Sequence, residues 1–153
     1  MSTYACKDDD SGSTPVAEPT ASEKMIGDPY NFYDVTSTID YSDFYNNLGV
    51  NDTTTSERAN WMPCELDNKI TFLTAATCQF DEGPVKCDAA DPQTESFPWS
   101  LLTNDTQMVL DGDTLNIYVN DGTRLEFGQT MMEYEPNSTT VIATVDFRYF
   151  LIR

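Results

Sequence analysis

The sequence predicts an all-β fold, a small antiparallel up-and-down β-barrel of about eight strands. Residues 141–152 alternate so that one face of the expected strand is wholly apolar, and this face needs a core against it. Its C-terminal position suits the closure of a barrel. Earlier stretches are short and separated by turn residues, which favours a meander of hairpins over a sandwich, although periodicity alone does not separate the two. The apolar face comprises Val141, Ala143, Val145, Phe147, Tyr149 and Leu151.

The remaining elements follow from the same patterns. Residues 30–39 are rich in aromatic and β-branched side chains and predict a first strand. Residues 40–49 place aromatic side chains at helical spacing and end in Gly49, which favours a short helix. Residues 51–60 are polar and predict a loop. Further strands are expected at 68–74, 78–80, 97–101, 107–110, 115–119 and 125–127.

Turn residues separate these strands. Asn104-Asp105 predicts a turn, and Asp111-Gly112 and Asn120-Asp121-Gly122 predict short hairpins. Pro98 lies inside an expected strand, and because proline has no backbone N–H it suggests an edge or a bend there.

The composition restricts the partners. The chain of 153 residues carries 26 Asp and Glu against 8 Lys and Arg, a net charge of −18. This balance argues against binding to nucleic acid and against unaided adhesion to anionic lipid. The acidity fits a soluble surface, with binding of divalent cations as the alternative reading. No apolar run is long enough to span a bilayer, and the length suggests one domain.

The N-terminus resembles the end of a bacterial lipoprotein signal, with the small Ala5 before Cys6. The acidic run that follows Lys7 is similar to the sequences that direct Bacteroidetes lipoproteins to the outer face of the outer membrane. We therefore expect Cys6 to carry lipid, residues 1–24 to be a signal remnant and a flexible acidic tether, and residues 25–153 to form the domain. The alternative is a merely solvated acidic N-terminus.

A second resemblance covers residues 64 to 153. Its motifs are Cys64, Asp67-Asn68, Ile70-Thr71-Phe72, Asp81-Glu82-Gly83, Cys87-Asp88, Asp91-Pro92-Gln93 and Trp99-Ser100-Leu101. This pattern resembles bacterial lipocalin-like lipoproteins of the Bacteroidetes type. The resemblance implies a barrel rather than a sandwich, a disulfide between Cys64 and Cys87, and a surface-exposed place on the outer membrane, or otherwise a periplasmic or extracellular one. Cys78 is then expected to be a buried, unpaired thiol.

The residue types exclude several kinds of catalysis. The chain has no histidine, so neither a Ser-His-Asp nor a Cys-His arrangement can form, and the cysteines lack the spacing of a zinc site. The sequence contains none of the glycine-rich motifs that bind nucleotides. A pair of carboxylates is the remaining catalytic option. We expect no enzyme activity, no cofactor and no metal.

The barrel interior is the candidate site. A barrel of about eight strands is either filled by its own side chains or holds one small ligand, and the sequence leaves both options open. The favoured function is a binding module for a small apolar or amphipathic molecule, held to the membrane through its lipid anchor alone. The alternative is an interaction protein that binds a protein or glycan through its outer surface or through the tyrosine-rich segment 30–45. The residues expected to face inward are Trp99, Leu115, Ile117, Val119, Phe147 and Tyr149.

Overall fold

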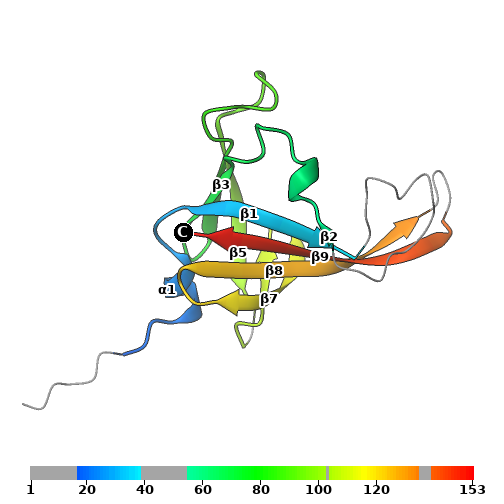
Figure 1. The fold of residues 1–153 in the computed structure, drawn as a ribbon. Helices are drawn as coiled ribbons and strands as arrows, with labels where there is room; N and C mark the ends of the chain where they lie inside the picture. The colour runs from blue at the N-terminus through cyan, green and yellow to red at the C-terminus, as the bar shows by residue number, and fades with distance from the viewer. Residues whose placement is uncertain (1–16, 39–54, 103, 135–138) are drawn as a thin grey trace, which may run out of the picture.

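Eight antiparallel strands close into one barrel, which confirms the expected fold (Figure 1). The computed structural model describes residues 17–38, 55–102, 104–134 and 139–153. In these ranges no helix is long and apolar enough to cross a membrane. A short helix, α1 (Ala21–Met25), precedes the strands, and a 3-10 helix, η1 (Arg58–Asn60), follows β2. The strands are β1 (Tyr30–Ser37), β2 (Thr55–Ser56), β3 (Lys69–Thr74), β4 (Thr77–Asp81), β5 (Thr94–Leu101), β6 (Gln107–Leu110), β7 (Asp113–Asn120), β8 (Arg124–Tyr134) and β9 (Val141–Ile152).

Pairing of β1 with both β3 and β9 closes the ring. From β3 to β9 each strand pairs with the next one along the chain, which is the up-and-down order that the sequence predicts. The β1–β9 ladder runs from Asn31↔Ile152 to Ser37↔Phe147, so the C-terminal strand completes the barrel. β2 pairs with β1 beside the ring, so the eight strands of the ring are β1 and β3 to β9.

Residues that tolerate positive φ form the tight turns. Asn104 and Asp105, with φ of 75° and 55°, lie between β5 and β6. Asp111 and Gly112, with φ of 50° and 94°, join β6 to β7. Two successive positive φ angles match the right-handed twist of a hairpin, and Asn, Asp and Gly adopt them most readily. Both turns lie where the sequence predicts them.

β8 and β9 continue past the ring as a two-stranded ribbon, at the right of Figure 1. The pairing of β8 with β7 ends at Gly128, and the pairing of β9 with β1 ends at Phe147. The two strands then pair with each other as far as Tyr134↔Val141. Alternation predicts the long β9 correctly, but it does not show that the first part of this strand leaves the barrel.

A short helix lies across one end of the barrel, which we call the closed end. α1 begins with a capping box: the Thr20 hydroxyl accepts the Glu23 N–H, and the Glu23 carboxylate accepts the Thr20 N–H. Met25, the last residue of the helix, is fully buried in the core. The boundary expected between residues 24 and 25 falls inside α1, before its last residue.

Other expectations lie partly or wholly outside the described residues. Residues 1–16, with Cys6 and most of the acidic tether, are among them, so the lipid attachment site stays a prediction. The helix expected at 40–49 also lies outside. The described part of the expected loop 51–60 contains β2 and η1.

Pro98 lies in a strand that is paired on both sides, so of the two expectations, an edge or a bend, the edge is wrong. It pairs with Thr77 on β4, whereas the β5–β6 ladder begins one residue later, at Trp99↔Leu110. The Pro98 carbonyl accepts the Asp111 N–H at 2.9 Å. The proline nitrogen lies opposite the turn after β6 rather than opposite β6 itself. Its missing N–H therefore removes no hydrogen bond from the β5–β6 ladder.

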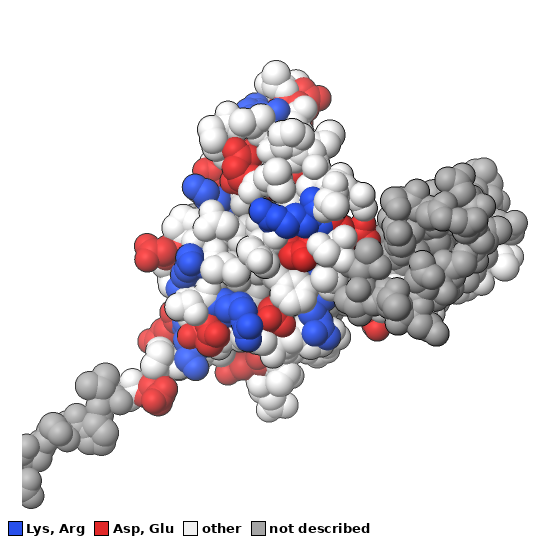
Figure 2. Space-filling model, viewed as in Figure 1, with Lys and Arg blue, Asp and Glu red and all other residues white. Residues whose placement is uncertain are grey.

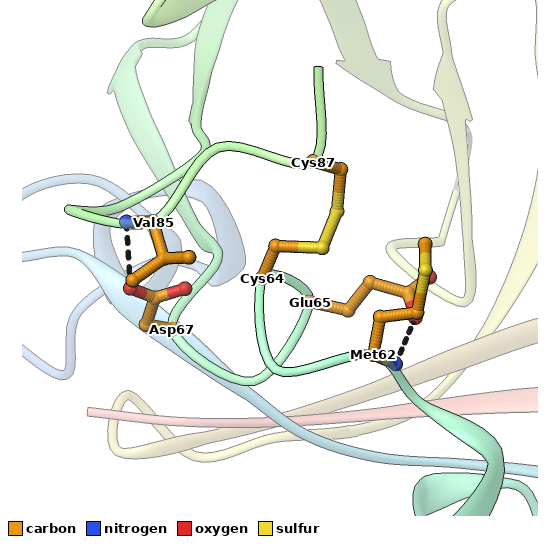
Figure 3. The surroundings of a disulfide bond; sticks show 6 residues. All are labelled: Met62, Cys64, Glu65, Asp67, Val85 and Cys87. Atoms are coloured by element: carbon orange, nitrogen blue, oxygen red, sulfur yellow. Dashed lines mark hydrogen bonds between the residues drawn. A yellow bond between two sulfur atoms is a disulfide. The ribbon is translucent and has the colours of Figure 1, made fainter. Parts of the chain in front are cut away.

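A disulfide joins Cys64 and Cys87, which is the pairing that the resemblance implies (Figure 3). It connects the segment before β3 to the loop between β4 and β5. The Asp67 carboxylate accepts the Val85 N–H at 3.3 Å and links the same two segments a second time. The cysteines are 23 residues apart, and closing such a loop stabilises the fold by about 3 kcal/mol through the entropy of the unfolded chain.

Candidate binding cavity at the barrel mouth

Side chains fill the half of the barrel next to α1. Phe72 and Trp99 pack edge to face with ring centroids 4.7 Å apart, and the Trp99 indole donates to the Thr74 carbonyl at 2.8 Å. Cys78 lies in this layer as a free, fully buried thiol, as expected, and burial raises its pKa. The residues of this packed layer are Met25, Tyr30, Ile70, Phe72, Cys78, Trp99, Met108, Leu115, Leu125, Phe127 and Leu151.

The other half of the barrel contains a cavity of about 260 Å³. All eight strands of the ring and the β6–β7 turn contribute to its lining, so the cavity is the mouth of the barrel interior and not a hollow on the outer surface. The floor of the cavity is formed by three residues that also belong to the packed layer, namely Ile70, Leu115 and Phe127. The lining residues are Phe32, Ile70, Phe80, Phe97, Leu110, Asp111, Asp113, Leu115, Phe127, Gln129 and Tyr149.

Aromatic rings make up much of the cavity wall. Phe127 and Tyr149 stack with centroids 5.2 Å apart and ring planes at 18°. Phe32 and Phe80 meet edge to face with centroids 6.0 Å apart. Ring pairs in these geometries attract each other beyond the effect of area burial, so each ring helps to fix its neighbour. These ring pairs therefore hold the cavity wall in place.

Polar groups lie among the apolar lining. Asp111 and Asp113 flank Gly112 in the β6–β7 turn and are exposed, and Gln129 on β8 is half-buried. Burial raises the pKa of the Tyr149 hydroxyl, and the negative charge of Asp113 raises it further. Tyr149 is therefore neutral at physiological pH, and its hydroxyl is available as a hydrogen-bond donor.

Four of the six residues that we expected inside the barrel lie in it. Trp99 is in the packed layer, and Ile117 packs against that layer. Leu115 and Tyr149 line the cavity. The expected interior is thus divided between a filled half and an open half, a combination of the two options that the sequence left open.

The other two residues lie elsewhere. Val119 is half-buried and follows a register shift in the pairing of β7 with β8, between Ile117 and Val119. Phe147 lines a separate, more polar hollow together with Tyr118 and Arg148, at the point where β9 leaves the ring. Alternation does not reveal such register shifts or departures from the ring.

Most of the cavity lining was not expected from the sequence. Phe80 and Phe97 alternate with Cys78 and Trp99 along β4 and β5, so their inward direction was available from the pattern. Asp111 and Asp113 lie at a turn, where acidic residues are explained by backbone geometry alone. The ring closure brings these side chains together from distant parts of the chain.

The tyrosine-rich segment is not one exposed surface in its described part. Tyr30 is fully buried, and Phe32 lines the cavity. Tyr33 is 56% exposed, and the Arg58 guanidinium lies over its ring, 5.4 Å from the centroid. Residues 39–45 of the segment lie outside the described ranges. Tyr30 therefore does not contribute to an exposed contact surface, the alternative reading of this segment, and Phe32 faces the cavity instead.

Comparisons with known proteins do not assign the chain to a family. No protein-family model, curated protein or solved structure matches it. The likeness to lipocalin-like lipoproteins therefore stays a prediction from the sequence motifs, while the barrel and the disulfide stand on the structure itself.

Proposed function

We propose that this protein is a binding module that holds one small, mostly apolar molecule in the mouth of its barrel. The observation that carries this proposal is the cavity of about 260 Å³, lined from every strand of the ring and walled by aromatic side chains. Concave, preformed and mostly apolar sites with a few polar groups are the usual form of small-molecule sites. The role is that of a carrier or sensor and not of an enzyme.

The dimensions of the cavity limit the ligand. Typical ligand sites occupy roughly 300–1,000 Å³, and the cavity of about 260 Å³ lies just below that range, so it takes only a small molecule. The packed layer around Phe72 and Trp99 prevents a ligand from passing deeper into the barrel. A single ring with a short chain fits these limits better than a long acyl chain.

Binding of 4-phenylbutanol, followed by NMR chemical shifts, tests the proposal. We expect saturable shifts at residues of the cavity wall. Leu110→Trp places a bulky ring in the cavity and should weaken binding about tenfold or more, because the apolar area that the ligand buries is taken by the new side chain.

Thr114→Trp is the matched control. Thr114 is exposed, and it lies on β7 opposite Val109, the neighbour of Leu110 on β6. This variant adds the same ring outside the cavity and should bind as the wild type does. Absence of saturable binding to the wild type would contradict the proposal, as would equal binding by the two variants.

We propose further that the module is anchored to the cell envelope through lipid on Cys6. The support is the Ala5-Cys6 sequence with the acidic run after it, together with the Cys64–Cys87 disulfide, since disulfides persist in oxidising compartments. Labelling of the source cells with an alkyne-tagged fatty acid should tag the protein and place it in the membrane fraction. Cys6→Ser should abolish both results, and a soluble, unlabelled wild type would contradict the anchor.

A further inference from the structure

We infer that the cavity selects ligands whose polar end is a cation, such as a small aromatic or alkyl amine. This inference rests on the proposed function and names the class of ligand. It follows from the chemistry of the cavity wall, from the acidic residues in its lining and from the positions of the basic side chains.

The aromatic wall favours a cation over other polar groups. The face of a phenyl ring carries negative charge density, and a cation over it gains roughly 0.5–2 kcal/mol, depending on how far it is desolvated. The cavity is lined by Phe32, Phe80, Phe97, Phe127 and Tyr149, so an ammonium group that enters it has aromatic rings on more than one side. Anions gain nothing from such faces.

Two carboxylates supply the counter-charge. Among the lining residues that the structure describes, Asp111 and Asp113 are the only carboxylates; Asp111 lies in the β6–β7 turn, and Asp113 is the first residue of β7. The turn is held in place because the Asp111 N–H donates to the Pro98 carbonyl at 2.9 Å and because Leu110 and Asp113 pair across it. An ammonium that reaches this turn finds acceptors whose backbone is already ordered. Charge-assisted hydrogen bonds of this kind are about twice as strong as neutral ones.

Within the described part of the chain, no Lys or Arg lines the cavity. Of the described arginines, Arg58 lies over Tyr33 and Arg124 pairs with Glu126. Figure 2 shows basic groups intermingled with acidic ones on one outer face of the molecule. A ligand with an anionic end would therefore meet the two carboxylates of the cavity without a compensating cation.

The net charge of the whole chain also favours a cationic ligand. Its net charge of −18 attracts cations and repels anions, and a recess with apolar walls concentrates this field. Neutral polar ligands retain hydrogen bonds with Gln129 and Tyr149 but gain nothing from the charge. The order of affinity that follows is cation, then neutral molecule, then anion.

The test compares 4-phenylbutylamine, 4-phenylbutanol and 5-phenylpentanoate by titration calorimetry at low and at high salt. The three share one apolar body and differ in charge at neutral pH. We expect the wild type to bind the amine about tenfold more tightly than the alcohol and the acid most weakly. High salt should reduce the ratio of amine to alcohol affinity, because the carboxylates of the turn are exposed.

The double variant Asp111→Asn, Asp113→Asn should lower the ratio of amine to alcohol affinity to about threefold. This is the preference for the amine that the aromatic wall gives without the carboxylates. Asparagine suits this test because it tolerates the positive φ of Asp111. Asp105→Asn is the control: Asp105 also has positive φ, but it lies in the β5–β6 turn and not in the cavity lining, so the ratio should stay at the wild-type value.

Each failure has a distinct meaning. Equal binding of amine and alcohol by the wild type overturns the inference and leaves the binding function in place. An unchanged ratio in the double variant overturns the role of the two carboxylates. Absence of binding for all three compounds overturns the proposed function itself.

Discussion

Gly128→Ala is expected to lower the free energy of unfolding by about 3 kcal/mol, as a severe overpacking does. A Cβ at this position would lie 1.9 Å from the Phe147 carbonyl oxygen and 3.0 Å from the Arg148 Cα. Both are backbone atoms of β9, so no side-chain rotation removes the contact. Relief requires β8 and β9 to separate at the point where both strands leave the ring.

Urea denaturation followed by tryptophan fluorescence measures this effect. Gly112→Ala is the control, because Gly112 has a φ of 94° but a Cβ there would have no heavy atom within 4 Å. It should lose about 1 kcal/mol, the cost of placing an L side chain in the left-handed region. A Gly128→Ala protein as stable as the Gly112→Ala protein would show that the β8–β9 crossing is not tightly constrained.

The requirement for glycine at position 128 illustrates where the sequence stops being informative. Alternation correctly predicts that Leu125 and Phe127 face the core, and the Asp-Gly and Asn-Asp pairs predict the turns. Strand alternation and turn formation are local properties, because each depends on residues only a few positions apart in the sequence. The contact between Gly128 and Phe147 depends on how tightly two strands cross, and this follows from ring closure and stagger rather than from local pattern.

The candidate site shows the same limit. An inward direction is predictable for Leu115 and Tyr149, but their depth along the barrel axis is not. Strand tilt and stagger decide which inward residues meet at one level, so the sequence could not show that Trp99 fills the closed half while Tyr149 lines the open one. The acidic residues of the β6–β7 turn have a sufficient local explanation, and only the structure shows them in the cavity lining.

The start of α1 was predictable from a signal that composition obscured. Residues 17–24 are polar, which suggested a tether, but Thr20 and Glu23 have the spacing of a capping box, and the apolar Met25 and Ile26 follow. This signature marks the start of a helix even in a polar stretch. Because α1 packs against the barrel, a truncation at residue 25 would remove part of the closed end.

Arg153→Ala is expected to lower the free energy of unfolding by about 3 kcal/mol. The guanidinium donates to the carbonyls of Asp28 at 3.0 Å, Lys24 at 3.1 Å and Gly122 at 2.9 Å, and also to that of Met25. Hydrogen bonds from a charged donor contribute roughly 1.5–3 kcal/mol each, although such values do not add fully. The variant leaves these acceptors without their donor and disconnects α1 from the β7–β8 turn.

Arg148→Ala is the matched control for this measurement. Both guanidinium groups lie over a tyrosine ring, Arg153 at 4.2 Å from the Tyr30 centroid and Arg148 at 4.0 Å from the Tyr118 centroid. Arg148 and Tyr118 are exposed, so its loss should cost no more than about 1 kcal/mol. Arg153→Lys should fall between the alanine variant and the wild type, because an ammonium keeps the charge but not the fork that reaches several carbonyls. Equal losses for Arg148→Ala and Arg153→Ala would mean that ring stacking, and not the bonds to the carbonyls, holds the closed end together.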